Sequence, residues 1–186
     1  MTPKPRCVIV TGQAGSGKTT LAKKLAERLW LPGISRDEIK QGYVETHGVT
    51  HDRLPPGSDK IVTDLFFEMI HRYLEGKISI VIEAAFQHHV WEPRMPTLIE
   101  LGSPFIVLCE IDPILAARRH LDRGLENPER ERYHSDNRVT HFRKTGEFLY
   151  PAKYDAPRLD LPTIKVATEA DYNPSVEEIV AAIKAS

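Results

Sequence analysis

The sequence predicts an α/β fold in which a parallel sheet of about five strands is flanked by helices. Short apolar runs lack the polar alternation of half-exposed strands, which is typical of strands buried on both faces. Segments with apolar residues at helical spacing separate these runs. A glycine-rich segment directly follows the first run. Strands that alternate with helices in this way usually lie parallel in one sheet.

Five segments are expected to form the strands. The first, residues 7–11 (CVIVT), is short, apolar and rich in β-branched side chains. The others are residues 34–35, 78–82, 105–111 and 163–166. Each strand is followed by polar or turn-forming residues, so the polar groups should gather where the strands end.

Helices are expected between these strands because apolar residues recur every three or four positions. Turn and capping signals set several boundaries, such as Gly76 after one helix and Asp112-Pro113 before another. The charged run 127–137 is expected to form a solvated loop. The expected helices are residues 18–29, 58–74, 91–101 and 139–149, a helix opened by Asp112-Pro113, and a final one opened by Asn173-Pro174.

Length and charge place limits on the class of protein. The 186 residues fit one domain spanning 1–186. A formal net charge of -1 gives no global reason to expect nucleic acid or an acidic membrane as a partner. Cys7 and Cys109 lie inside apolar runs, and no apolar run approaches the roughly 20 residues of a membrane span. We therefore expect a protein of a reducing compartment, most simply the cytoplasm.

The segment GQAGSGKT at residues 12–19 matches the pattern G-x-x-x-x-G-K-[ST] between a strand and a helix. Glycines let such a loop approach phosphates closely, and its N–H groups form an anion-binding nest. The lysine would reach the β- and γ-phosphates of ATP, and the threonine hydroxyl would bind Mg²⁺. The residues expected to bind the nucleotide are those of this segment and the residue after it: Gly12, Gln13, Ala14, Gly15, Ser16, Gly17, Lys18, Thr19 and Thr20.

Two acidic residues follow other strands. Glu83 comes after the third strand, where a carboxylate could hold Mg²⁺ together with Thr19, although an exposed carboxylate at the rim is the alternative. Asp37 follows the second strand, where it could take the proton of an attacking hydroxyl. An ordinary helix start at residues 35–38 is the alternative for Asp37.

Arg119 and Arg123 are four residues apart and share one helical face. Arginines on a segment that closes over ATP could stabilise the charge of the transferring phosphoryl group. The alternative is a solvated helix in which Arg118 pairs with Asp122.

Four segments in this order resemble a family of small P-loop kinases: VIVTGQAGSGKTTLAKKLA, SRDEI, IVIEAAF and IDPILAARRHLDRG. That family includes the 5′-kinase domain of polynucleotide kinases, chloramphenicol phosphotransferases and zeta-toxin-like kinases. The resemblance covers nearly the whole chain. It implies a P-loop NTPase fold whose P-loop strand neighbours the Glu83 strand.

The resemblance also implies roles for individual residues. It implies an arginine-bearing lid at about residues 113–137, with Arg119 nearest the phosphates. It makes Asp37 the base that activates the acceptor, and it places Thr168 near the adenine. Many relatives have aspartate where this chain has Glu83. Polynucleotide kinases have an arginine where this chain has Lys40, so a nucleic-acid acceptor is disfavoured.

The sequence therefore predicts an enzyme that uses ATP and Mg²⁺ to phosphorylate a hydroxyl of a small molecule. Two alternatives remain open, a polynucleotide 5′-hydroxyl kinase and a non-catalytic nucleotide-binding regulator. The acceptor pocket is expected to draw on residues 36–43, residues 86–91 and the helix after Ser58.

Overall fold

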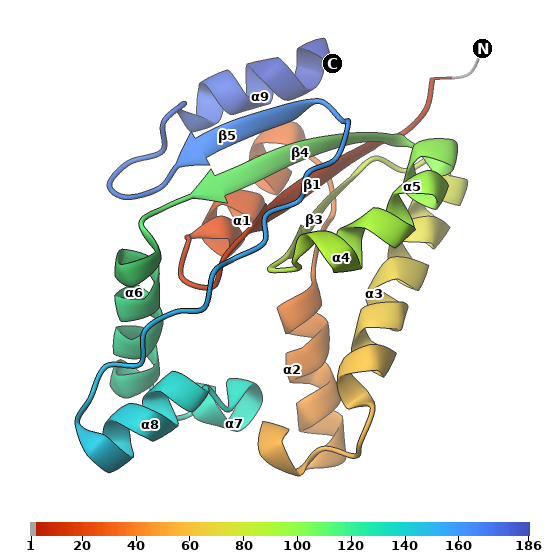
Figure 1. Ribbon diagram of the computed structural model, residues 1–186. Coiled ribbons are helices and arrows are strands. Elements are labelled where there is room, and N and C mark those ends of the chain that lie inside the picture. Colours follow the sequence, from red (N-terminus) through yellow and green to blue (C-terminus); the bar gives the residue numbers. More distant parts are fainter. Residues whose placement is uncertain (1–2) are drawn as a thin grey trace.

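A computed structural model describes residues 3–186 and contains one five-stranded sheet (Figure 1). The strand order is β2-β3-β1-β4-β5, and all four neighbouring pairs are parallel, which confirms the predicted fold class. β1 is central, with β3 on one side and β4 on the other. The strands are β1 (Arg6–Gly12), β2 (Gly33–Ser35), β3 (Ile80–Ala84), β4 (Ser103–Glu110) and β5 (Thr163–Ala167).

Helices cover both faces of the sheet, and alternate residues of β1 enter two separate cores. Val8 and Val10 pack with α1 and α9 on one face, and Cys7 and Ile9 pack with α3, α4 and α5 on the other. The α-helices are α1 (Lys18–Leu29), α2 (Arg36–His47), α3 (Ser58–Glu75), α4 (His88–Trp91), α5 (Met95–Leu101), α6 (Pro113–Glu126), α7 (Arg130–His134), α8 (Asn137–Thr145) and α9 (Val176–Ala185), and the 3₁₀ turns are η1 (His51–Arg53) and η2 (Glu92–Arg94).

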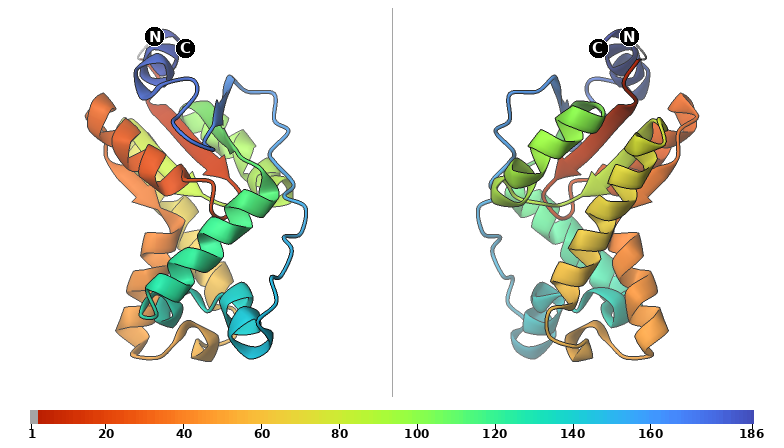
Figure 2. Two further views of the ribbon diagram at one scale, coloured as in Figure 1. Left: turned by 90° about the vertical axis from the view of Figure 1, so that its left-hand side faces the viewer. Right: turned by 90° about the vertical axis from the view of Figure 1, so that its right-hand side faces the viewer.

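Two groups of helices extend beyond the sheet at the carboxyl ends of its strands (Figures 1 and 2). α2 follows β2 and packs against α3, whereas α6, α7 and α8 follow β4. The short helix α7 reaches across and contacts α2. The P-loop, residues 12–19, lies at the carboxyl ends of the strands. The space next to it is therefore bordered by segments that are far apart in the sequence.

An extended segment returns from α8 to β5 at the edge of the sheet (Figure 1). It is fixed near its middle, where the Tyr154 hydroxyl donates to the carbonyl of Phe86 over 3.0 Å and lies 3.3 Å from the Thr11 hydroxyl. The N–H of His88 donates to the carbonyl of Asp155 over 2.8 Å. The segment is thus tied to the carboxyl end of β1, directly before the P-loop.

Several predicted boundaries were wrong. The run 127–137 is not simply a solvated loop, because Arg130–His134 form α7 and pack against α2. The helix predicted at 91–101 begins earlier, at His88, and is interrupted by η2. Pro93 and Pro96 lack the N–H group that a continuous α-helix needs there.

Other differences concern where elements begin and end. β3 continues through Glu83 to Ala84, so this carboxylate lies within the strand. The helix predicted at 139–149 runs from Asn137 to Thr145, because Asp136 caps its start and Gly146 ends it in the left-handed region at φ 74°. None of the helices formed by residues 3–186 is both long and apolar enough to cross a membrane.

Candidate active site

The P-loop is a tight turn between β1 and α1. Gly15 and Gly17 have φ values of 88° and 77°, which favour glycine over any residue with a Cβ. A Cβ on Gly15 would also lie 2.0 Å from the carbonyl oxygen of Ala116 on α6. The Gln13 side chain donates to the carbonyl of Ile111 over 3.0 Å. The loop is therefore held in shape by α6 and by the end of β4, as well as by its own sequence.

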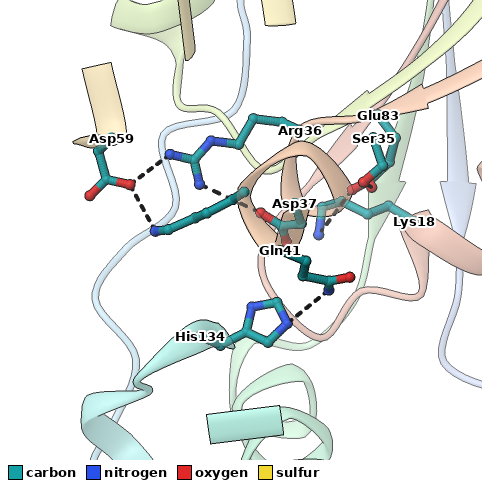
Figure 3. Close-up of polar contacts among 9 residues, drawn as sticks. Lys18, Ser35, Arg36, Asp37, Gln41, Asp59, Glu83 and His134 are labelled. Carbon is teal, nitrogen blue, oxygen red and sulfur yellow. Dashed lines mark hydrogen bonds and ion pairs between the residues drawn. The ribbon is translucent and has the colours of Figure 1, made fainter. Parts of the chain in front are cut away.

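Lys18 and Glu83 form a buried ion pair beneath the loop. The Lys18 Nζ lies 3.4 Å from Glu83 Oε1, and the two side chains are 8% and 3% exposed (Figure 3). The Ser35 hydroxyl donates to Glu83 Oε2 over 2.7 Å. Ser35 precedes α2 as its N-cap residue, yet its hydroxyl does not cap the helix. The ion pair thus fixes Lys18 and Glu83 relative to each other. The hydrogen bond from Ser35 also fixes the carboxyl end of β2 to Glu83.

Thr19 and Glu83 fit the requirements of a Mg²⁺ site beside bound phosphates. Both line one cavity of about 240 Å³, together with Ser35. Glu83 Oε1 is buried, and the Lys18 ammonium 3.4 Å away is its ion-pair partner without a hydrogen bond among residues 3–186. A carboxylate oxygen that can give up this contact, in one cavity with a threonine, suits a hard cation that keeps several water ligands.

Asp37 lies in the first turn of α2, and 42% of its side chain is exposed. Its carboxylate is 3.6 Å from the Arg36 guanidinium. Asp37 also lines a pocket together with Ala14 of the P-loop. The structure therefore brings Asp37 and the P-loop to one pocket.

Arg119 and Arg123 border a different hollow, which also includes Gly15 and Gly17. The Arg119 guanidinium donates to the carbonyl of Thr168 over 2.8 Å and to the carbonyl of Glu169. Thr168 is only 4% exposed, and its N–H and hydroxyl groups both donate to the carbonyl of Glu110. Arg119 thus joins α6 to the loop after β5 beside the P-loop.

Sequence reasoning missed the contribution of α7 and its flanking residues. Arg130 and His134 line the same pocket as Ala14 and Asp37. The side-chain amide of Gln41 lies 3.2 Å from His134 Nε2, and Figure 3 draws His134 across from Asp37. The predicted lid at about residues 113–137 includes both residues, but no sequence signal singled them out, because their place depends on how α7 packs against α2.

Two groups of this pocket, His134 and Asp136, have lowered pKa values. Burial, followed by the positive charge of Arg130, lowers the pKa of His134 to about 4, so the imidazole is neutral at pH 7. His120 Nδ1 lies 2.6 Å from Asp136 Oδ2. Burial raises the pKa of Asp136, but the hydrogen bond and charge of His120 outweigh burial and lower it overall.

Two basic residues of α2 pair with one acidic residue of α3. Arg36 and Lys40 each lie 2.7 Å from the same oxygen of Asp59 (Figure 3). Burial raises the pKa of Asp59, yet these two hydrogen bonds lower it overall to about 2. The Lys40 side chain is only 12% exposed. Lys40 is therefore occupied by Asp59.

The aromatic residues expected in the acceptor pocket lie elsewhere. Trp91 is fully buried and donates from its indole nitrogen to the Thr11 hydroxyl over 3.2 Å. Phe86 packs edge-on against Phe66 and Trp91 and stacks on Phe67. These side chains belong to the core between α3, α4 and the sheet.

A family model described as an AAA domain matches residues 7–144, which include the P-loop, Asp37, Glu83 and α6. The chain belongs to this AAA domain family. No curated protein matches the sequence significantly. The matched residues contain most of the site but not the loop after β5, which carries Thr168.

Solved structures share the fold of this AAA domain protein over nearly its whole length. A kinase-like protein from Chloroflexus aurantiacus has a TM-score of 0.75 at 20% identity, covering 100% of this chain and 97% of that one. A gluconokinase from Sinorhizobium meliloti has a TM-score of 0.61 at 15% identity, covering 98% and 94%. The APS kinase of Mycobacterium tuberculosis, in complex with AMPPNP and APS, has a TM-score of 0.60 at 14% identity, covering 98% and 99%. The chain thus has the fold of small P-loop kinases, as its sequence motifs predicted.

Proposed function

We propose that this protein is a kinase that transfers the γ-phosphate of ATP to a hydroxyl group of a small molecule. The observation that carries this proposal is the pocket between the P-loop and α7. Ala14 of the loop and the Asp37 carboxylate line the same pocket. A triphosphate held by the loop would therefore end next to a carboxylate able to accept the proton of an attacking alcohol.

Each residue of the loop has a defined task in this scheme. The backbone N–H groups of residues 13–19 surround the β- and γ-phosphates, and Lys18 exchanges its contact with Glu83 for a contact with phosphate. Thr19 and Glu83 would hold Mg²⁺, which when bound neutralises charge on the phosphates. Gly15 and Gly17 share their hollow with Arg119 and Arg123, which supports placing the nucleotide beside α6.

The transfer itself needs one base and no covalent enzyme intermediate. The acceptor oxygen forms a bond to the γ-phosphorus as the bond to the β,γ-bridging oxygen breaks, giving ADP and a phosphate ester. Asp37 takes the hydroxyl proton and later releases it to solvent. The Arg36 guanidinium lies 3.6 Å from the Asp37 carboxylate and would stay beside it during the transfer.

A nucleic-acid acceptor is less well supported than a small molecule. Lys40 would have to bind the acceptor's phosphate, but its ammonium group is held by Asp59 at 2.7 Å. Releasing it would leave Asp59 with one cation instead of two. This pairing favours the small-molecule reading over a polynucleotide 5′-hydroxyl kinase.

Two substitutions test the proposal. We expect Lys18→Ala to lower phosphate transfer and nucleotide affinity together, with transfer falling by about 100-fold or more. Asp37→Asn should lower transfer by about 100-fold or more while leaving the affinity for a non-hydrolysable ATP analogue unchanged. Transfer would be measured from [γ-³²P]ATP across hydroxylated metabolites, antibiotics and 5′-hydroxyl oligonucleotides.

Asp64→Asn is the matched control, because Asp64 is a helical aspartate of similar exposure, 39%, but it lies on α3 and pairs with Arg94 at 2.9 Å. It should retain transfer. A non-catalytic nucleotide-binding regulator would instead bind ATP and phosphorylate nothing, and its properties would not change in Asp37→Asn. Absence of Mg-dependent ATP binding in the wild type would refute the kinase proposal altogether.

A further inference from the structure

The pocket beside Asp37 has walls that define the chemistry of its ligand. It encloses about 460 Å³, which is enough for a small metabolite. Only one of its lining side chains, Ala14, is apolar. The remaining lining residues are Asp37, His120, Arg130, His134, Ser135, Asp136 and Asn137.

A pocket of this composition disfavours an aromatic or extended apolar acceptor. Such a molecule gains affinity by removing apolar surface from water, and here Ala14 is the one apolar side chain among those that line the pocket. A molecule with several hydroxyl groups can instead bond to side-chain donors and acceptors on every side. The pocket walls therefore suit a polyhydroxylated compound.

The charges of the pocket are not all neutralised within the protein. Asp136 is occupied, because one oxygen lies 2.6 Å from His120 Nδ1 and the other accepts the N–H of Arg138 over 2.9 Å. Among residues 3–186, no acidic side chain forms an ion pair with Arg130. Arg130 therefore offers an unpaired guanidinium to the pocket.

His134 adds a neutral hydrogen-bonding group beside this cation. Burial and Arg130 hold its pKa at about 4, and Gln41 lies 3.2 Å from its Nε2 atom. A neutral imidazole of fixed orientation can donate to or accept from a hydroxyl group. It adds no second positive charge, so the guanidinium is the part of the pocket that selects an anion.

From these walls we infer that the acceptor is a small polyhydroxylated anion, whose reacting hydroxyl meets Asp37 while its anionic group binds Arg130 and another hydroxyl bonds to His134. The inference rests on the proposed kinase activity and specifies its substrate class. The anionic group could be a carboxylate, as in a sugar acid, or a phosphate ester, as in a sugar phosphate. In either case Arg130 and His134 determine specificity.

The test compares three acceptors of matched length: a linear sugar acid, its phosphate-ester counterpart and the neutral polyol. We expect the wild type to use one or both anions with a kcat/KM at least about 10-fold above that for the polyol. Arg130→Gln should raise the KM for the anion by about 10- to 100-fold and leave the KM for ATP and for the polyol unchanged. Arg130→Lys should recover part of the loss. His134→Ala should raise the KM for both kinds of acceptor.

Arg132→Gln is the matched control, because Arg132 lies on the same short helix but pairs with Glu45 at 3.2 Å. It should leave every KM unchanged. An equal fall in kcat for anion and polyol in Arg130→Gln would show that Arg130 contacts the transferring phosphoryl group, and this would overturn the inference. Preference for neutral or aromatic alcohols would also overturn it and leave the kinase proposal intact. Absence of ATP binding would instead remove the kinase proposal itself.

Discussion

The nucleotide side and the acceptor side of the site are built in different ways. The nucleotide side is a run of consecutive residues between one strand and one helix, and Gly12, Gly15, Ser16 and Lys18 are buried. The acceptor side is assembled from α2, α6 and α7, whose residues lie about a hundred positions apart, and Asp37 remains partly exposed. A local motif fixes its own chemistry, whereas the chemistry of an assembled pocket depends on how distant helices pack.

The largest expected effect tests whether the P-loop keeps its shape by its own sequence alone or also through its contact with α6. Gly15→Ala should destabilise the protein by roughly 2–4 kcal/mol, because the left-handed backbone is strained and the new Cβ meets Ala116. Gly17→Ala is the control, since no atom lies within 4 Å of its Cβ position, and it should cost about 1 kcal/mol. Urea unfolding measures both. Equal losses would mean that α6 gives way and does not constrain the loop.

A smaller effect is expected where the two sides meet, at the bond from Ser35 to Glu83. Ser35→Ala should destabilise the protein by about 1.5–3 kcal/mol, because this bond goes to a buried charge. The control is Ser58→Ala, since Ser58 is also buried at a helix start but donates to the neutral carbonyl of Pro55, and it should cost about 1 kcal/mol. Thermal unfolding of both variants decides between these values. If Ser35→Ala lost no more stability than Ser58→Ala, the Glu83 carboxylate would be more hydrated than its buried position indicates.

The smallest effect probes the acceptor side through pH. The pKa of His134 is lowered from 6.5 in the unfolded chain to about 4 in the folded one. Between these values the unfolded state binds more protons, so His134 makes stability fall as pH drops from about 6.5 towards 4. We expect His134→Gln to lose this part of the pH dependence and to match the wild type at pH 7.5 more closely than at pH 5. Parallel stability curves would mean that the imidazole is solvated.

This contrast also explains how much could be predicted from the sequence. The parallel sheet was predicted from strands that alternate with helices, and the resemblance to small P-loop kinases implied that the P-loop strand neighbours the Glu83 strand. The central position of the P-loop strand was not predicted. The ion pair between Lys18 and Glu83 joins two residues that were each singled out, although the pairing itself was not foreseen.

The rest depends on tertiary packing. Nothing in the charged run around Arg130 and His134 distinguishes a pocket wall from a solvated loop, because α7 acquires its role only through contact with α2. Likewise, Phe86 and Trp91 follow a polar strand end, yet a cluster with Phe66 and Phe67 draws them into the core. The roles of Asp37, Arg119, Arg123 and Thr168 stay predictions.

The anchoring of Tyr154 and Asp155 restricts how the region between β4 and β5 can rearrange. Asp112 caps the start of α6, and Tyr154 bonds to Phe86 beneath the P-loop, so the intervening chain is tethered at both ends. The guanidinium of Arg119 also ties α6 to the carbonyls of Thr168 and Glu169, beside the P-loop. Farther along, Gly146 occupies the left-handed region and Tyr150 is 73% exposed. Any rearrangement of α7 and α8 that keeps these bonds must therefore take place between Arg119 and Tyr154, and the sheet need not move.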